Sequence, residues 1–192
     1  MKNKAFLLAL SLSTACNFTG VFVPDPIDPR LPMYTETGND VAGAFVNKIV
    51  WKSIATSETG FISPGYDFGF PSIYFYDSGD RIKLKLTGKL SGVETDLIFD
   101  ILTSNISSPE DFARLNDSKI ILDGVNNKGY LRSSRYQLNS SSGVGQIYFK
   151  KINVSGQRIS IAGTFGFLVS DPIYGNLDVS YGRFDYGECE VY

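Results

Sequence analysis

Alternation of apolar and polar side chains with a period of two is the feature that most constrains the fold of this chain. From Arg81 to Leu86 every second residue is apolar, and the residues between them are cationic. Because successive side chains of a β-strand point to opposite faces, such a run predicts a strand with one buried face. A longer run has apolar residues or glycine at every second position: Ile159, Ile161, Gly163, Phe165, Phe167 and Val169. The glycine in the middle of this run predicts that a neighbouring backbone approaches closely there.

Shorter runs of the same kind, separated by turn residues, predict further strands. The first pair spans 41–52 around a turn at Asn47-Lys48, and we expect Phe45, Ile49 and Trp51 to be buried there. In the last strand the apolar parity changes from odd to even at Gly182, which predicts a β-bulge at that residue. The other strands are expected at 73–76, 97–101, 119–123, 130–138 and 147–149.

One short helix is expected near 109–116. Ser108 is a favourable N-cap, and Pro109 is tolerated at the first helical position. About nine or ten short strands with a single short helix predict an all-β protein, either an antiparallel β-sandwich or a flattened barrel. A calycin-like closed barrel is the alternative.

The 192 residues include no histidine, and their formal net charge is −2. The absence of histidine excludes Ser-His-Asp and Cys-His relays and histidine-ligated metal sites. We therefore predict no catalytic residues, no metal and no cofactor, and we expect that the protein is not an enzyme. The 18 basic residues are scattered along the chain, which argues against a nucleic-acid partner.

The first sixteen residues have the pattern of an export signal. A basic start at 1–4 precedes eight residues at 5–12 that are apolar but for one serine, too few to span a bilayer, and no later segment reaches 18 apolar residues. Residues 13–16 read Ser-Thr-Ala-Cys, which resembles the lipobox of bacterial lipoproteins. The resemblance implies that residues 1–15 are removed and that Cys16 receives the lipid. An ordinary secretory signal with a coincidental cysteine is the alternative.

A proline-rich stretch follows the cysteine. Half of the eight prolines lie within nine residues, at Pro24, Pro26, Pro29 and Pro32. Closely spaced prolines favour extended polyproline II, so residues 16–39 are predicted to be a lipid-anchored spacer. A single β domain is expected over 40–192. The second cysteine, Cys189, is predicted to be an unpaired thiol.

Two stretches resemble the uncharacterised envelope lipoproteins common in Bacteroidota. Residues 38–51 match a strand, a tight Asn-containing turn and a second strand that ends in Trp51. Residues 159–167 and 181–185 are similar to the family's closing Gly-Thr-Phe-x-Phe strand and its Gly-Arg-Phe-Asp ending. The resemblance implies an envelope lipoprotein with a β-rich domain, and it brings no catalytic residues with it.

Residues 61–76 are dense in aromatic side chains between glycines and prolines. Exposed rings on such a segment suit a sugar- or peptide-binding surface, so Tyr66, Phe68, Tyr74 and Tyr76 are the candidate ligand-binding residues. The alternative is that these rings fold back onto the edge of the sheet. Carboxylates at Asp77, Asp80, Glu94, Asp96 and Asp100 could in principle form a glycosidase pair, although aspartates beside a Ser-Gly turn are favoured for turn hydrogen bonds alone.

The sequence thus predicts a membrane-anchored envelope lipoprotein whose β domain is a binding or interaction module for a glycan or a protein. The alternatives are a carboxylate-based hydrolase and a structural envelope component without a ligand. We expect lipid anchorage in the outer membrane. Residues 17–21 contain no acidic side chain after Cys16, which favours the periplasmic side over the cell surface.

Overall fold

The computed structural model describes residues 23–53, 70–76, 78–133, 138–139 and 143–192. Most of these residues belong to strands: β1 (Val41–Val46), β2 (Ile49–Ser53), β3 (Ser72–Phe75), β4 (Arg81–Leu90), β5 (Val93–Leu102), β6 (Ser118–Asp123), β7 (Lys128–Ser133), β8 (Leu138–Asn139), β9 (Val144–Ser155), β10 (Arg158–Asp171), β11 (Gly175–Tyr186) and β12 (Glu190–Val191). The fold is all-β, as the alternation predicts.

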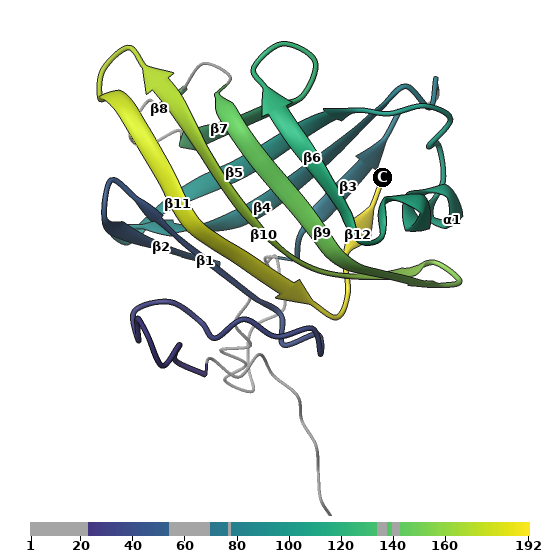
Figure 1. Cartoon of the computed structure of the whole chain (residues 1–192), viewed down its shortest axis with the longest axis horizontal. Coiled ribbons are helices and arrows are strands. Elements are labelled where there is room, and N and C mark those ends of the chain that lie inside the picture. The colour runs from purple at the N-terminus through teal and green to yellow at the C-terminus, as the bar shows by residue number, and fades with distance from the viewer. Residues whose placement is uncertain (1–22, 54–69, 77, 134–137, 140–142) are drawn as a thin grey trace, which may run out of the picture.

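The strands form one curled sheet. Its path runs β6-β9-β10-β11-β1-β2-β4-β5-β7-β8, and β3 pairs with β4 on the same side as β2. All pairings are antiparallel except that of β12 with β3. Figure 1 shows β9, β10 and β11 crossing in front of β4 and β5. Within the described residues the path has two ends, so these strands make a flattened half-barrel and not the closed calycin-like barrel of the alternative.

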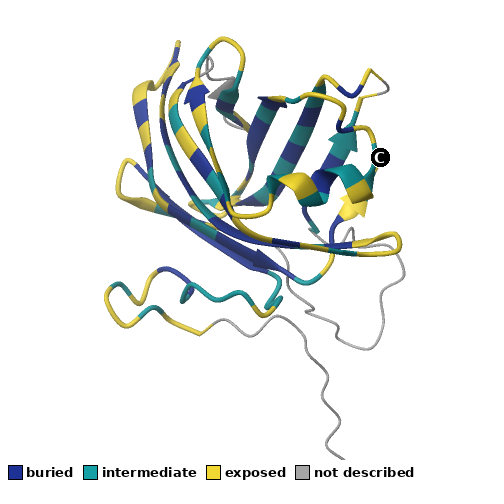
Figure 2. Ribbon diagram, turned by 45° about the vertical axis from the view of Figure 1, so that its right-hand side comes forward, coloured by how far each residue is buried: buried dark blue, intermediate teal, exposed yellow. Residues whose placement is uncertain are grey.

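The curled sheet has two facing layers, with β9, β10 and β11 in one and β4 and β5 in the other (Figure 1), and the core fills the space between them. Along β4 and β10 buried and more accessible residues alternate, which Figure 2 shows as bands of colour along the strands. The rings of Phe165 and Phe167 both contact Phe99 of β5 edge to face, with centroids 5.2 and 5.6 Å apart. These contacts join the two layers, and they confirm the buried parity predicted for 159–169. A Cβ at Gly163 would overlap the carbonyl oxygen of Tyr148, so the close backbone approach predicted there is present.

The bulge in β11 lies one residue before the predicted position. Phe165 pairs with Gly182 and Phe167 with Val179, so a single residue of β10 faces two residues of β11, Ser180 and Tyr181. Tyr181 has a φ of 53° and its side chain is 73% exposed. The ring of Phe165 occupies the space that a side chain at position 182 would fill. Glycine therefore follows the bulge because the ring packs directly on its backbone.

The first hairpin turns where it was expected to. Asn47 and Lys48 both have positive φ, 47° and 69°, as a two-residue turn of type I′ requires. Phe45 and Trp51 are buried, but Ile49 is 49% exposed, so the expectation that it belongs to the core was wrong. Ile49 is the first residue after the turn and lies at the margin of the sheet.

The short helix begins directly after its predicted N-cap, Ser108, and ends at Phe112, before the expected residue 116. The backbone N–H of Asp111 donates to Ser108 Oγ at 3.2 Å, and α1 (Pro109–Phe112) passes into a 3₁₀ turn, Ala113–Leu115. Phe112 is fully buried and packs edge to face on Phe149. No helix in the described part of the chain is both long and apolar enough to cross a membrane.

Residues 23–39, which we call the N-terminal arm, pack against the outer side of β1 and β11. Leu31 is fully buried, and the ring of Pro32 lies where a side chain at Gly43 would be. Arg183 forms an ion pair with Asp25 and donates to the carbonyl of Pro32 at 3.2 Å. The extended spacer predicted over 16–39 was thus wrong from residue 23 onward, because the arm buries apolar side chains on the sheet. Figures 1 and 2 show this arm beneath the sheet.

Asp185 fixes the end of the arm. Its carboxylate is buried and accepts hydrogen bonds from the backbone N–H groups of Gly38, Thr37 and Asn39 at 2.8, 3.2 and 3.3 Å. It also accepts the hydroxyl of Thr35. A buried carboxylate needs several donors to offset its lost hydration, and the arm supplies them. The β domain therefore includes the arm and does not begin at residue 40.

Truncation of the core rings tests the assignment of faces. Phe165→Ala and Phe167→Ala should each lower the free energy of unfolding by about 3–5 kcal/mol, the usual cost of removing a buried ring. Leu168→Ala is the matched control, since Leu168 lies on the same strand and is 54% exposed. It should cost about 0.5 kcal/mol or less. Urea unfolding measures all three, and equal losses at both kinds of position would contradict the assignment.

A second pair of substitutions tests whether the arm belongs to the folded domain. Leu31→Ala should lower the free energy of unfolding by about 2–5 kcal/mol, because it removes a fully buried side chain from the contact between the arm and the sheet. Ile27→Ala, in the same arm, should cost about 0.5 kcal/mol or less, since Ile27 is 94% exposed. If Leu31→Ala were as mild as Ile27→Ala in urea unfolding, the arm would not belong to the folded domain.

Candidate functional site

Two of the four candidate ligand-binding residues lie in the described part of the chain. Tyr74 is on β3 and Tyr76 follows that strand directly, while Tyr66 and Phe68 lie outside the described residues. The ring of Tyr74 stacks on that of Tyr192, with centroids 4.9 Å apart and planes inclined by 15°. Tyr192 follows β12, whose parallel pairing with β3 brings the two rings together. These rings therefore lie on the outer face of the sheet, and Tyr74 is half-buried against Tyr192 beside the edge strand β12.

The register of the strands extends this aromatic group across the sheet. Tyr74 pairs with Lys83 of β4, which pairs with Asp100 of β5, and Tyr130 of β7 lies one row away opposite Ile98. We call the outer face of β3, β4, β5, β7 and β12 the tyrosine surface, with these six residues as its main members: Tyr74, Tyr76, Lys83, Tyr130, Arg132 and Tyr192. Tyr130, Arg132 and Tyr192 were not among the sequence candidates.

Cations lie over the rings of this surface. Lys83 Nζ is 5.6 Å from the centroid of the Tyr76 ring, and the guanidinium of Arg132 is 5.1 Å from that of Tyr130. The hydrogen-bonding contact with Tyr76 raises the pKa of the Lys83 ammonium group, and burial raises the pKa of the Tyr130 hydroxyl. Lysine and arginine positioned over aromatic rings are attracted by the negative face of the ring. The arrangement places the cations beside flat apolar faces.

The tyrosine surface carries an excess of positive charge. The outward positions of β4 and β7 hold six cations, and those of β5 and β12 hold four carboxylates. Asp100 forms an ion pair with Arg81 at 2.7 Å, and Glu190 accepts the hydroxyl of Tyr192 at 2.9 Å. The cations are Arg81, Lys83, Lys85, Lys89, Lys128 and Arg132, and the carboxylates are Glu94, Asp96, Asp100 and Glu190. The surface thus combines rings, hydroxyl groups and a positive potential, although the whole chain is slightly acidic.

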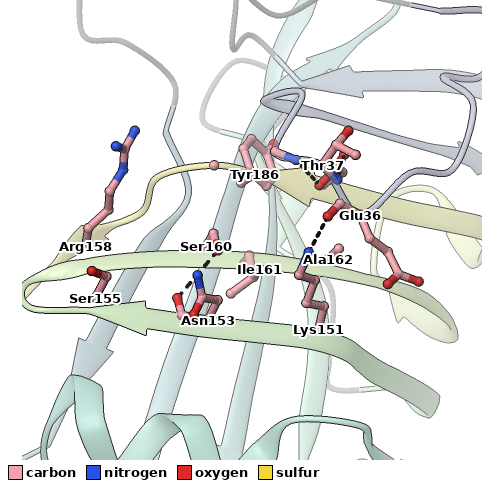
Figure 3. Close-up of a pocket in the computed structure, with 13 residues that line it drawn as sticks. Glu36, Thr37, Lys151, Asn153, Ser155, Arg158, Ser160, Ile161, Ala162 and Tyr186 are labelled. Atoms are coloured by element: carbon pink, nitrogen blue, oxygen red, sulfur yellow. Dashed lines mark hydrogen bonds between the residues drawn. The ribbon is translucent and has the colours of Figure 1, made fainter.

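A concave region, which we call the polar groove, lies between the arm and the hairpin of β9 and β10. Its volume is about 600 Å³. Figure 3 shows Lys151, Asn153 and Ser155 on one strand, Ser160 and Ala162 on the next, and Glu36 and Thr37 across from them. The remaining lining residues are Gly38, Arg158, Ile161, Asp185, Tyr186 and Gly187.

Many polar groups of this groove already have partners in the protein. Lys151 Nζ donates to the carbonyl of Glu36 at 2.7 Å, and Arg158 lies 3.4 Å from the carboxylate of Glu188. Ser160 Oγ donates to the carbonyl of Asn153 at 3.5 Å, and Asp185 accepts the donors of the arm. The groove is therefore a junction that attaches the arm to the sheet.

The carboxylates of the hydrolase alternative also have local partners. Asp80 accepts the hydroxyl of Ser78, Asp96 accepts that of Thr87 at 2.9 Å, and Asp100 pairs with Arg81. Asp77 lies outside the described residues. A glycosidase needs two carboxyl groups that flank a space for the sugar. The carboxylates with these partners are instead used in a turn and in cross-strand contacts.

Of the two cysteines, only Cys189 lies in the described part of the chain. Cys16, the residue expected to carry the lipid, lies outside the described residues. Cys189 is a free and buried thiol, and burial raises its pKa well above the ordinary value, so it is poorly suited to react as a thiolate. In the part of the chain that the structure describes, no three or more side chains of His, Cys, Asp or Glu are grouped so as to hold a metal ion.

Comparison with known proteins adds no relative from which a function could be transferred. Neither a protein-family model nor a curated protein nor a solved structure matches the chain. The resemblance to Bacteroidota envelope lipoproteins therefore stays a prediction from the sequence. The geometry of the tyrosine surface is what bears on its function.

Proposed function

We propose that this protein is a lipid-anchored envelope protein whose β domain binds an acidic glycan on the tyrosine surface. The observation that carries the proposal is the stacked pair of Tyr74 and Tyr192 beside Tyr76 and Lys83 on one exposed face. Flat rings pack against the C–H faces of sugar rings at little cost in side-chain entropy. Hydroxyl groups and cations next to the rings supply the hydrogen bonds that fix the orientation of the sugar.

The charge of the surface favours sugars that carry carboxylate or phosphate groups. The outward positions of β4, β5, β7 and β12 together hold six cations and four carboxylates. Opposite charges on the ligand would be attracted over distances of about 8 Å at physiological salt. A protein ligand is the second candidate, since tyrosine-rich surfaces also bind proteins, and it would need acidic groups to match. The partnered carboxylates support a hydrolase less well.

The anchor is the second part of the proposal. Cys16 would receive the lipid after removal of residues 1–15, and stable anchorage follows from two or more acyl chains. We place the protein in the outer membrane, on the periplasmic side. The segment that would connect Cys16 to the described arm is short, and the arm itself is fixed to the sheet.

Loss of the acceptor cysteine tests the anchor. Cys16→Ala should abolish labelling by a fatty-acid probe and release the protein from the membrane fraction, because the thiol that carries the lipid is gone. Labelling in cells followed by fractionation measures both effects. An unlabelled wild-type protein, or a Cys16→Ala variant that still sediments with membranes, would contradict lipid anchorage.

Binding is tested with a soluble form that begins at Val23, so that the arm is retained. We expect this form to bind acidic oligosaccharides on a glycan array, and Tyr74→Ala and Tyr76→Ala to weaken that binding by about tenfold each, the effect of losing one stacked ring. Tyr181→Ala is the matched control, because this exposed tyrosine lies on β11, outside the tyrosine surface.

Three results would decide between the candidate ligands. Binding that weakens at Tyr74 and Tyr76 but not at Tyr181, and that falls with added salt, supports the acidic glycan. Binding to a peptide array alone, with the same pattern of variants, would assign a protein ligand to the surface. Equal weakening by Tyr181→Ala and Tyr74→Ala, or an array without any bound ligand, would contradict a binding role for the tyrosine surface.

A further inference from the structure

A third surface lies beside the arm, and we call it the arm face. It is the outward side of the arm together with the adjacent parts of β1 and β11, and its main residues are Ile27, Arg30, Phe45, Lys48, Asp178 and Tyr181. They surround a cleft of about 460 Å³. The guanidinium of Arg30 lies 4.5 Å from the centroid of the Phe45 ring, which Tyr181 contacts edge to face. Ile27 and Tyr181 are the exposed large hydrophobic residues here, at 94% and 73%.

Backbone hydrogen bonds tie Val23, the first described residue, to the rest of the arm. The N–H of Met33 donates to the carbonyl of Val23, and the N–H of Asp25 donates to the carbonyl of Leu31 at 3.0 Å. Backbone N–H groups of Asp28 and Ile27 also donate to the Asp25 carboxylate and lower its pKa. Together with the ion pair to Arg183, these bonds hold the arm as a bend against the sheet and not as an extended spacer.

The chain between the expected lipid and the arm is short. Seven residue steps separate Cys16 from Val23. A fully extended chain covers at most about 3.6 Å per residue, so the whole connection reaches about 25 Å. A flexible chain of that length has a mean end-to-end distance of about 15 Å. The arm face therefore stays within the reach of one short segment from the headgroups in which the lipid is anchored.

We propose that the arm face rests on the phospholipid headgroups of the leaflet that holds the Cys16 lipid. This inference depends on the lipid anchorage proposed above. Ile27 and Tyr181 are the side chains that enter the interface, where tyrosine is favoured because one end is apolar and the other polar. The short connection gives these residues a high effective concentration at the bilayer, so weak apolar contacts are enough to orient the domain.

The charges of the arm face exclude a mainly electrostatic contact. Three cations, Arg30, Lys48 and Arg183, are matched by three carboxylates, Asp25, Asp28 and Asp178. The surface is thus neutral overall, and added salt should not release it from anionic headgroups.

Site-directed spin labelling of the full lipidated protein tests the orientation. Single variants Ile27→Cys and Val125→Cys are labelled with a nitroxide and reconstituted in vesicles of phosphatidylethanolamine and phosphatidylglycerol. Val125 is the matched control, because it is 70% exposed in the turn between β6 and β7. Cys189 is buried and reacts slowly, so the introduced thiol takes the label. Relaxation by oxygen and by a water-soluble nickel complex measures how deeply each label lies.

We expect the label at position 27 to lose accessibility to nickel and to keep accessibility to oxygen, at low and at high salt alike. The label at 125 should remain as accessible to nickel as in the detergent-free soluble form. Insertion of about twenty Gly and Ser residues after Gly20 roughly doubles the mean reach of the connection, and it should reduce the protected fraction at position 27 by about sevenfold if that fraction is small.

Other results overturn the inference in distinguishable ways. If the protein floats with the vesicles and the labels at 27 and 125 are equally accessible to nickel, the anchor stands and the orientation is wrong. If protection at 27 disappears at high salt, the contact is electrostatic and the apolar contact proposed here is wrong. If the protein neither takes up a fatty-acid probe nor floats with vesicles, the lipid anchorage fails, and this inference fails with it.

Discussion

The bulge in β11 is the constraint on which much of this structure depends. Before it, Leu177 and Val179 face the core, and after it the core is filled by Phe184 and Tyr186. Without the extra residue, Arg183 and Asp185 would keep the odd parity and point into an apolar interior, where an unpaired charge is very costly. The bulge turns both to the outer face. There they hold the arm, Arg183 through Asp25 and Asp185 through the loop at 35–39.

The same bulge shapes both neighbouring strands. On the β10 side the single residue Gly166 faces Ser180 and Tyr181, and on the β1 side Ala44 alone faces Tyr181 and Gly182. An extra residue in a strand increases its local twist and bends it. The local bend of β11 and the attachment of the arm therefore both depend on this bulge, in which Tyr181 lies in the left-handed region.

The sequence predicted the features that depend on interactions between residues close together in the chain. Parity along one strand identifies its buried face, so the core rings at Phe165 and Phe167 and the bulge near Gly182 were predicted closely. The arm could not be, because prolines read locally favour an extended chain, whereas the burial of Leu31 depends on a glycine at position 43 and on β11. The partner of Tyr74 was missed for the same reason. Only the parallel pairing of β12 with β3 brings Tyr192 beside it.

The tyrosine surface also shows why local patterns mark a site only in part. Tyr74 and Tyr76 stood out because aromatic residues are dense around them, but Tyr130 occupies a polar parity flanked by Lys128 and Arg132. The sequence did place the Tyr130 ring between two outward cations, an arrangement that is unusual for a purely solvated face. Only the strand register shows that Tyr130 lies one row from Lys83 on the neighbouring strands.

The fixed arm changes what an N-terminal lipid would do for this domain. A long flexible spacer would let every face of the domain sample the membrane and the surroundings equally. A bend held by Asp25 and Arg183, with only a short connection before it, would transmit the position of such an anchor to the sheet itself. The tyrosine surface lies on β3, β4, β5, β7 and β12, and none of its main residues belongs to the arm face. Contact of the arm face with headgroups would therefore orient the domain while those tyrosine rings stayed available to a ligand.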